Sequence, residues 1–264
     1  MSRIAEAFER ARAEGRAAFI AFLTAGDPAP DATERLAAAL EQAGTDVLEL
    51  GVPFTDPIAD GPVLQRSASR ALEGGTTLAD VFATARRIRS ATELALVLFS
   101  YANPLFRFGI ERSAEEARTA GFDGVLLTDV PPEEAGSFAP PIRASGLDTI
   151  FLVSPTSPRE RMEKAARLSS GFLYVVSRTG TTGSRDGLPP DLPETVARAR
   201  RAAKGLPIAV GFGIGTAAAA HQAAALADGV VVGSALVAEA ERAGSGREAA
   251  VGRLARELRE ACRR

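Results

Sequence analysis

The sequence has only one cysteine and one histidine among its 264 residues. With Cys262 alone, neither an internal disulfide nor a site of several thiolate metal ligands can form, which favours a reducing compartment. His221 lies in an alanine-rich stretch, 217–225, where we expect an exposed helical position rather than a metal or catalytic role. Histidine-based catalytic triads are thereby excluded, so any acid–base chemistry must come from other side chains.

Long apolar runs and an excess of basic charge are also missing. No stretch approaches the roughly 18 consecutive apolar residues of a membrane span, and the N-terminus has no apolar region of a secretory signal. The net charge is −2, and lysine and arginine form no local cluster, which argues against nucleic acid as a partner. We therefore expect a cytoplasmic protein that binds neither membrane nor nucleic acid.

Short apolar runs rich in valine, isoleucine, leucine and phenylalanine alternate with stretches of helical periodicity. Each run is typical of a strand buried on both faces, and the runs lie at 18–23, 46–51, 94–100, 123–128, 149–153, 171–176, 207–211 and 229–233. Helices are predicted at 31–43, 77–90, 112–120, 132–144, 158–169, 191–203, 216–227 and 247–262. Eight such units favour a closed parallel (β/α)8 barrel, a TIM barrel forming one domain over 1–264, rather than a doubly wound open sheet.

Several local signals refine this prediction. Thr77 with Asp80, and Ser113 with Glu116, have the spacing of helix starts. An extra helix at 1–13 precedes the first strand and either covers the bottom of the barrel or frays. The segments that follow strands are longer and richer in glycine and proline than those that precede them. In a barrel these loops surround the active-site mouth; they lie at 52–62, 101–109 and 177–190.

Glu49 stands in an apolar strand, where alternation places it on the face opposite to Leu48 and Leu50. If the leucines meet the helices, Glu49 points into the barrel, where an isolated carboxylate pays a desolvation cost as an anion. Its pKa should then rise toward neutrality, which suits a group that donates and accepts protons. A structural glutamate satisfied by a neighbouring hydroxyl is the alternative, and the strand pattern leaves both open.

Asp56 and Asp60 belong to the loop 53–62, which three prolines and a glycine restrict. Such a loop can hold a carboxylate in fixed geometry at the barrel mouth. Asp56 precedes Pro57 and can simply form an Asx turn, so composition alone does not single out Asp60.

Three glycine-rich segments late in the chain have the chemistry of a phosphate site: 180–183, 211–215 and 233–234. Glycines let backbone N–H groups approach a phosphate, and a helix that starts at Ser234 would point its positive end at it. One glycine pair is usually a turn. Three segments after the sixth, seventh and eighth strands favour a phosphorylated ligand, because barrels commonly bind phosphate there.

The run 48–62, LELGVPFTDPIADGP, closely resembles the signature of tryptophan synthase alpha subunits. The resemblance covers essentially the whole chain, with further matches at 22–28, 101–104, 128–131, 177–183, 211–214 and 233–234. Two positions depart mildly from the family pattern, with Thr55 where serine is common and Phe99 where leucine is common.

The resemblance implies a lyase that performs the retro-aldol cleavage of indole-3-glycerol phosphate to indole and glyceraldehyde 3-phosphate in tryptophan biosynthesis. Glu49 takes the role of the acid and base at indole C3 and at the glycerol hydroxyl, and Asp60 accepts the indole N–H. Physical chemistry agrees, because protonation at C3 makes the ring nitrogen cationic and a fixed carboxylate stabilises that charge. No Schiff base is needed, and Lys164 and Lys204 are the only lysines.

The same likeness assigns the substrate pocket. Core packing is the alternative for three of its members, Phe22, Phe99 and Leu126. The indole pocket would be lined by Phe22, Phe99, Tyr101, Leu126 and Phe212, with Tyr174 near the catalytic glutamate. Phosphate contacts would fall to Gly183, Gly213, Gly233 and Ser234, while Thr182 would meet Asp60 when the glycine-rich loop closes.

A partner is also implied, namely a beta subunit that carries pyridoxal phosphate in an alpha2beta2 complex, while this chain holds no cofactor or metal. The loop with Asp56 and Pro57 would serve that contact. Other phosphate-binding barrels are alternative readings. An indole-glycerol phosphate synthase would be expected to carry a catalytic lysine at a strand end, and this sequence has none there. A ribosylanthranilate isomerase remains as the runner-up. A stand-alone lyase, or a non-catalytic barrel that activates a beta subunit, are further alternatives.

Overall fold

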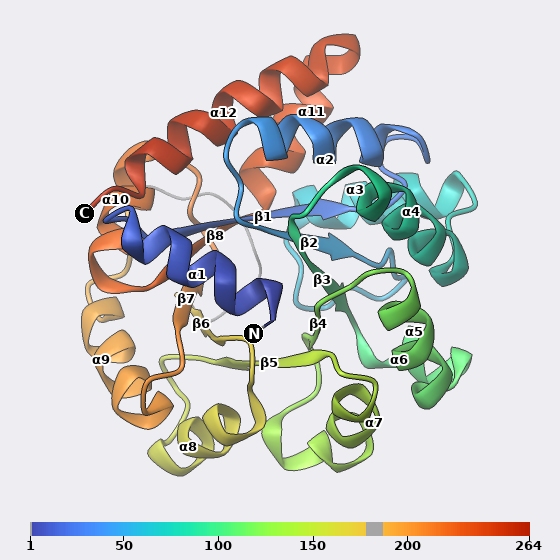
Figure 1. Ribbon diagram of the computed structural model, residues 1–264. Coiled ribbons are helices and arrows are strands. Elements are labelled where there is room, and N and C mark those ends of the chain that lie inside the picture. The colour runs from blue at the N-terminus through green and yellow to red at the C-terminus, as the bar shows by residue number, and fades with distance from the viewer. Residues whose placement is uncertain (1, 178–186) are drawn as a thin grey trace.

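Eight parallel strands close into a barrel in the computed structural model of the chain, which describes residues 2–177 and 187–264 (Figure 1). Each strand pairs with the next, and the first pairs with the eighth to complete the ring. The strands are β1 (Ala18–Thr24), β2 (Val47–Gly51), β3 (Ala95–Ser100), β4 (Gly124–Leu127), β5 (Asp148–Val153), β6 (Leu173–Val176), β7 (Ile208–Gly211) and β8 (Gly229–Val232). The TIM barrel prediction is confirmed, and all eight predicted apolar runs are strands.

Helices form the outer layer of the barrel (Figure 1). Those that match predicted stretches are α1 (Arg3–Ala13), α2 (Ala32–Gln42), α4 (Leu78–Ala91), α6 (Ile110–Thr119), α8 (Arg159–Leu168), α9 (Leu192–Ala203), α10 (Ala217–Leu226) and α12 (Arg247–Ala261). The predicted start of α4 is confirmed, because the Thr77 hydroxyl accepts the Asp80 N–H and the Asp80 carboxylate accepts the Thr77 N–H. A further helix, α11 (Ser234–Ala243), begins at Ser234 and is followed by the 3-10 turn η2 (Gly244–Gly246).

Three features of the helical layer differ from the prediction. Helix α5 (Ala102–Phe108) occupies a stretch that the sequence assigned to a loop, and helix α3 (Pro62–Glu73) begins at the end of the predicted 52–62 loop and continues through residues for which no element was predicted. The predicted helix 132–144 is two pieces, the 3-10 helix η1 (Pro132–Ser137) and α7 (Ala139–Ala144), since consecutive prolines at 140 and 141 donate no N–H to a continuous helix. Ser113 does not start a helix: it lies inside α6, and its buried hydroxyl donates to the Leu105 carbonyl.

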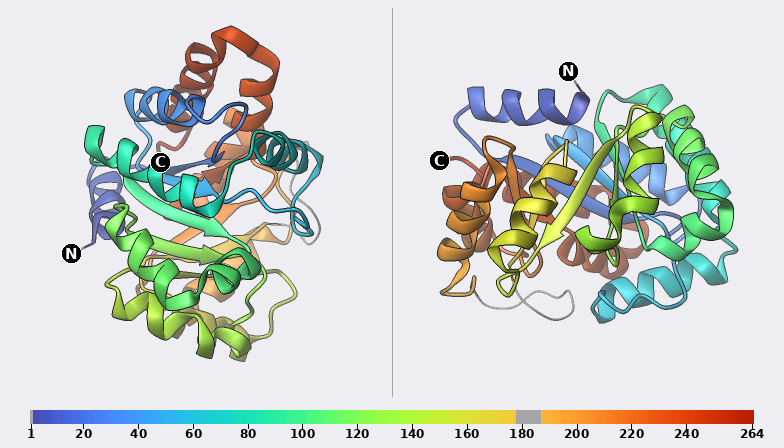
Figure 2. Two further views of the ribbon diagram at one scale, coloured as in Figure 1. Left: turned by 90° about the vertical axis from the view of Figure 1, so that its right-hand side faces the viewer. Right: turned by 90° about the horizontal axis from the view of Figure 1, so that it is seen from below.

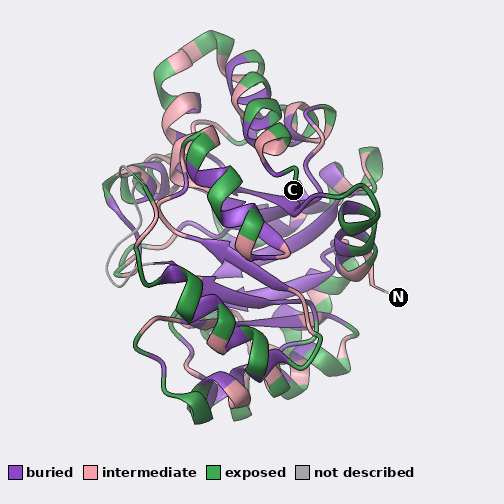
Figure 3. Cartoon of the chain, turned by 90° about the vertical axis from the view of Figure 1, so that its left-hand side faces the viewer, coloured by how far each residue is buried: buried purple, intermediate pink, exposed green. Residues whose placement is uncertain are grey.

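The strands place alternate side chains in two separate apolar clusters. Leu48 and Leu50 pack in the cluster beneath the helices, whereas Val47 belongs to the cluster that fills the barrel interior. Figure 3 shows the buried strands inside a layer of helices whose outer faces are exposed. Glu49 therefore shares the inward face with Val47, as the alternation predicted.

Helix α1 lies across one end of the barrel and covers it (Figures 1 and 2). Ile4 and Phe8 are buried in the interior cluster, and the Phe8 and Phe172 rings lie 5.5 Å apart. The prediction of a helix that covers the bottom is confirmed, and the alternative of a frayed segment is wrong. The chemistry must therefore use the opposite end of the barrel.

A buried ion pair lies at the same covered end. The Arg16 guanidinium donates to both carboxylate oxygens of Asp46, at 2.5 and 2.9 Å, and each side chain is only 3% exposed. Asp46 also accepts the Phe19 N–H at 2.8 Å, so the pair is fixed to β1. Next to it, the Ala17 N–H donates to the carbonyl of Cys262, a buried residue. The bond from Ala17 to Cys262 joins the two ends of the described chain under the barrel.

No helix of the described residues is both long and apolar enough to cross a bilayer. His221 lies exposed on α10, as predicted, with a ring nitrogen 3.3 Å from the Ala261 carbonyl. Within the same residues, no group of three or more histidine, cysteine, aspartate or glutamate side chains is arranged to hold a metal ion.

Candidate active site

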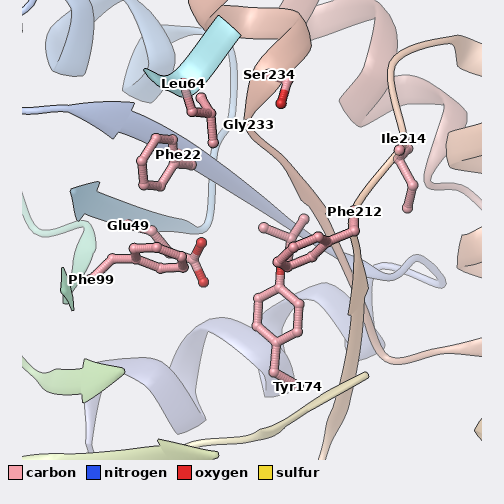
Figure 4. A pocket seen from close by; sticks show the side chains of 11 residues that line it. Phe22, Glu49, Leu64, Phe99, Tyr174, Phe212, Ile214, Gly233 and Ser234 are labelled. Atoms are coloured by element: carbon pink, nitrogen blue, oxygen red, sulfur yellow. The ribbon is translucent and has the colours of Figure 1, made fainter. Parts of the chain in front are cut away.

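Glu49 lines an open pocket of about 430 Å³ at the carboxyl ends of the strands (Figure 4). Side chains from β1, β2, β3 and β6 form its wall together with the segments after β7 and β8. The other lining residues are Phe22, Leu64, Phe99, Tyr174, Phe212, Gly213, Ile214, Val231, Gly233 and Ser234. Seven of the residues predicted to hold substrate are thus brought together around Glu49.

The Glu49 side chain points from β2 into this pocket (Figure 4) and is 1% exposed. Its Oε1 atom has no hydrogen-bond partner among the described residues. Burial raises the pKa of Glu49 to about 8, because the anion loses its hydration. The Glu49 carboxyl is therefore mostly protonated at neutral pH and can donate a proton.

Asp60 lines an adjoining pocket of about 310 Å³ at the end of the 53–60 loop. Phe22, Leu64 and Phe99 line both pockets, so these side chains stand between the two carboxyl groups. Burial raises the pKa of Asp60 to about 6, and a hydrogen bond donated by the Tyr101 hydroxyl at 3.1 Å opposes that rise. Asp60 is therefore mostly ionised at neutral pH, while Glu49 keeps its proton.

Aromatic rings form most of the apolar wall. The Phe22 and Phe99 rings meet edge to face, with centroids 5.0 Å apart, and Tyr174 meets Phe212 in the same way at 5.9 Å. Two glycines make room for these rings, because a Cβ on Gly211 would lie 2.0 Å from the Tyr174 hydroxyl oxygen. A Cβ on Gly51 would lie 2.5 Å from Phe22 Cζ. The wall is thus shaped for a flat apolar group.

The polar end of the Glu49 pocket is built from backbone. Gly213, Gly233 and Ser234 line it, and α11 begins at Ser234 with Gly233 as its N-terminal cap. Phe212 and Gly213 both have positive φ, at 72° and 84°, and the Ser177 hydroxyl donates to the Phe212 carbonyl. A helix N-terminus with adjacent glycines favours a bound anion such as phosphate.

Some predicted site residues lie elsewhere. Leu126 is fully buried in the interior cluster, beside Phe99 in the strand register, but lines neither carboxyl pocket. Asp56 is exposed on the loop, where it accepts the Thr55 hydroxyl at 2.5 Å, and Pro57 is half-buried and lines the Asp60 pocket. Thr182 and Gly183 lie outside the described residues.

Several lining residues were not predicted from the sequence. Leu64 lies on α3, and its only signal was an apolar position at helical spacing from Ala68 and Ala71. The remaining unpredicted members of the two pockets are Thr24, Gly51, Val52, Phe54, Ala68, Ser100, Ile214 and Val231.

Comparison with known proteins gives one consistent result. A family model described as tryptophan synthase alpha chain matches residues 8–263. The chain is 51% identical over 237 residues to the tryptophan synthase alpha chain of Solibacter usitatus, which covers 90% of this chain and 88% of the relative. It is 50% identical over 242 residues to that of Geobacter sulfurreducens, which covers 92% and 91%.

Solved structures agree with the sequence relatives. A Mycobacterium tuberculosis tryptophan synthase structure matches with a TM-score of 0.91 and 36% identity, and covers 100% of this chain and 99% of that one. The tryptophan synthase subunit alpha of Legionella pneumophila matches with a TM-score of 0.89 and 38% identity, over 99% and 98%. With a family match across almost its whole length and the same barrel, the chain belongs to the tryptophan synthase alpha chain family.

Proposed function

We propose that Glu49 and Asp60 are the catalytic residues that cleave indole-3-glycerol phosphate in this chain. The family membership makes the chain a lyase of tryptophan biosynthesis whose products are indole and glyceraldehyde 3-phosphate. The observation that supports the residue assignment is the pair of buried carboxyl groups at one barrel mouth, with pKa values of about 8 and about 6. One is protonated and the other ionised at neutral pH, which is what an acid and a cation-stabilising group require.

Glu49 moves the proton in this proposal. Its carboxylic acid protonates indole C3, and the resulting carboxylate removes the proton from the hydroxyl on the adjacent glycerol carbon. As the carbon–carbon bond breaks, its electron pair returns to the indole ring, and the hydroxyl-bearing carbon becomes the aldehyde. Glu49 ends the cycle protonated, so no external acid or base is consumed.

Asp60 stabilises the charge that the first step creates. Protonation at C3 converts the indole into a cation with its positive charge centred on the ring nitrogen. An ionised carboxylate that accepts the N–H of that nitrogen stabilises the cation more than the neutral substrate, so the interaction lowers the barrier. The indole ring would lie against Phe22, Phe99 and Phe212, where the two carboxyl pockets adjoin.

The phosphate would occupy the polar end of the Glu49 pocket. Gly213, Gly233 and Ser234 supply backbone N–H groups and the positive end of α11 there. We assign additional phosphate contact to Gly183, and contact with Asp60 to Thr182, from the family resemblance.

A beta subunit is the partner that the family implies. We extend this to an alpha2beta2 complex in the cytoplasm, with pyridoxal phosphate held by the beta subunit and no cofactor in this chain. The contact would include the loop with Asp56 and Pro57, whose neighbour Ile58 is 78% exposed. An exposed isoleucine on a proline-restricted loop suits burial by a partner.

Indole formation from indole-3-glycerol phosphate tests the proposal. The purified chain should release indole, and added beta subunit should increase the rate. Glu49→Gln and Asp60→Asn should each lower kcat/KM at least about a hundredfold, because proton transfer and charge stabilisation each contribute that much. Glu73→Gln, at an exposed position on α3, is the matched control and should keep the rate.

Other outcomes separate the alternatives. A high rate that the beta subunit does not change would indicate a stand-alone lyase. No indole under either condition, with a beta subunit that becomes more active on mixing, would indicate a non-catalytic activator. Full activity of both carboxyl variants would refute the residue assignment.

A further inference from the structure

The Tyr101 hydroxyl lies between two groups of the 53–60 loop. It accepts the Ala59 N–H at 3.0 Å and donates to Oδ2 of Asp60 at 3.1 Å. Tyr101 itself follows β3 directly and is only 4% exposed. Its ring also contacts that of Phe54, with centroids 5.2 Å apart. A residue next to β3 thus holds the start and the end of the loop that follows β2.

The direction of these hydrogen bonds follows from their chemistry. An amide N–H can only donate, so the hydroxyl must accept from Ala59 and keeps its one proton for Asp60. The hydroxyl also remains protonated around neutral pH, because burial and the nearby Asp60 raise the pKa of Tyr101 above its ordinary value of 10. Tyr101 is therefore a permanent donor to the Asp60 carboxylate.

The other hydrogen bonds that join Asp60 to described residues fix its backbone rather than its carboxylate. The Asp60 N–H donates to the Pro57 carbonyl at 3.0 Å, and Gln65 Nε2 donates to the Asp60 carbonyl at 2.8 Å. Neither bond reaches the carboxylate, whereas that of Tyr101 does. The Tyr101 hydroxyl thus acts on the orientation and on the charge of this group at once.

We propose that Tyr101 is a positioning residue that docks the 53–60 loop on β3 and holds the Asp60 carboxylate ionised and aimed at the substrate pocket. The inference rests on the proposed function of Asp60. A donor to a carboxylate stabilises the anion against the desolvation that burial imposes. Removal of that donor should therefore raise the pKa of Asp60, and it should free the Ala59 N–H.

The substitution Tyr101→Phe tests the inference, because it keeps the ring and its contact with Phe54 but removes the hydroxyl. A hydrogen bond to a charged group is worth roughly one pKa unit or more. From a pKa of about 6, this shift predicts roughly a fivefold loss of kcat/KM at pH 6 and almost none at pH 8. The acid limb of the pH profile should move up by about one unit.

Tyr174→Phe is the matched control, since Tyr174 is the only other tyrosine and lines the Glu49 pocket. Whatever its effect on the rate, this variant should leave the acid limb near pH 6. A loss in Tyr101→Phe that is equal at pH 6 and pH 8 would overturn the inference, because a merely structural role would not depend on pH.

A titration without substrate separates this inference from the proposed function. Carbon-13 NMR of the aspartate carboxyl groups, with the Asp60 signal assigned from Asp60→Asn, should give a higher pKa for Asp60 in Tyr101→Phe than in the parent chain. Equal pKa values would refute the role of Tyr101 even in an active enzyme. A raised pKa in a chain that forms no indole would support the Tyr101 contact and refute the proposed function.

Discussion

The burial of Glu49 predicts that the carboxyl group destabilises the fold as the pH rises. The folded-state pKa is about 8 and the ordinary value is 4.5. Between these values the unfolded chain releases the Glu49 proton while the folded chain retains it. Unfolding therefore releases a proton over this range, and the stability contributed by the protonated side chain is full below pH 4.5 and is lost progressively as the pH rises through 8.

The size of the effect follows from the two pKa values. Each unit of difference corresponds to about 1.4 kcal/mol, so the free energy of unfolding should fall by about 3 to 4 kcal/mol between pH 5 and pH 8 from this group alone. Above pH 8 both states are ionised and the loss levels off. Glu49→Gln removes the titration while it keeps a side chain of similar shape. The variant should therefore gain stability over the parent chain as the pH rises.

Urea denaturation at pH 5, 6, 7, 8 and 9 measures this difference directly. The gap between Glu49→Gln and the parent chain should widen by about 3 to 4 kcal/mol from pH 5 to pH 8 and then remain constant. Glu73→Gln, at an exposed site, should give a curve parallel to that of the parent chain. Parallel curves for Glu49→Gln as well would refute the reasoning, because they would mean that Glu49 titrates alike in the folded and unfolded states.

Two further substitutions test the packing. Asp46→Asn should lower the free energy of unfolding by about 3 kcal/mol, measured by urea denaturation, because it leaves the buried Arg16 charge without its bidentate partner. The control is Asp31→Asn, which changes an exposed ion pair and should leave the urea midpoint unchanged. Gly211→Ala should cost about 1 to 3 kcal/mol and lower the rate, because its Cβ would lie 2.0 Å from the Tyr174 hydroxyl oxygen. Adding Tyr174→Phe should restore part of that stability, and no recovery in the double variant would contradict the assigned clash.

The strands were predictable because each is a short apolar run buried on both faces, and the inward direction of Glu49 followed from alternation with Leu48 and Leu50. The two helices that were not predicted, α3 and α5, have no such clear pattern of apolar positions in the sequence. In α5, Asn103 and Pro104 form a pair typical of turns, although proline is tolerated in the first turn of a helix. In α3 the buried face is mostly alanine and serine, which gives a weak helical pattern.

The contact between Asp60 and Tyr101 illustrates what sequence reasoning could not supply. The two residues are 41 positions apart, and they meet because the register pairs Gly51 with Phe99, which places the loop after β2 beside the end of β3. Both residues could be named from family resemblance. The hydrogen bond between them, and hence the control of the Asp60 charge, depends on sheet register and loop geometry that spacing alone does not determine.

The pairing of β1 with β8 has a consequence for synthesis on the ribosome. Ala18 pairs with Gly229, so one edge of β1 stays unpaired until nearly the whole chain has been made. An unpaired, apolar strand edge readily binds other nascent chains, which makes this enzyme vulnerable to aggregation during translation. Shielding of β1 by a chaperone, until residues 229–232 leave the exit tunnel, would protect the chain over that interval.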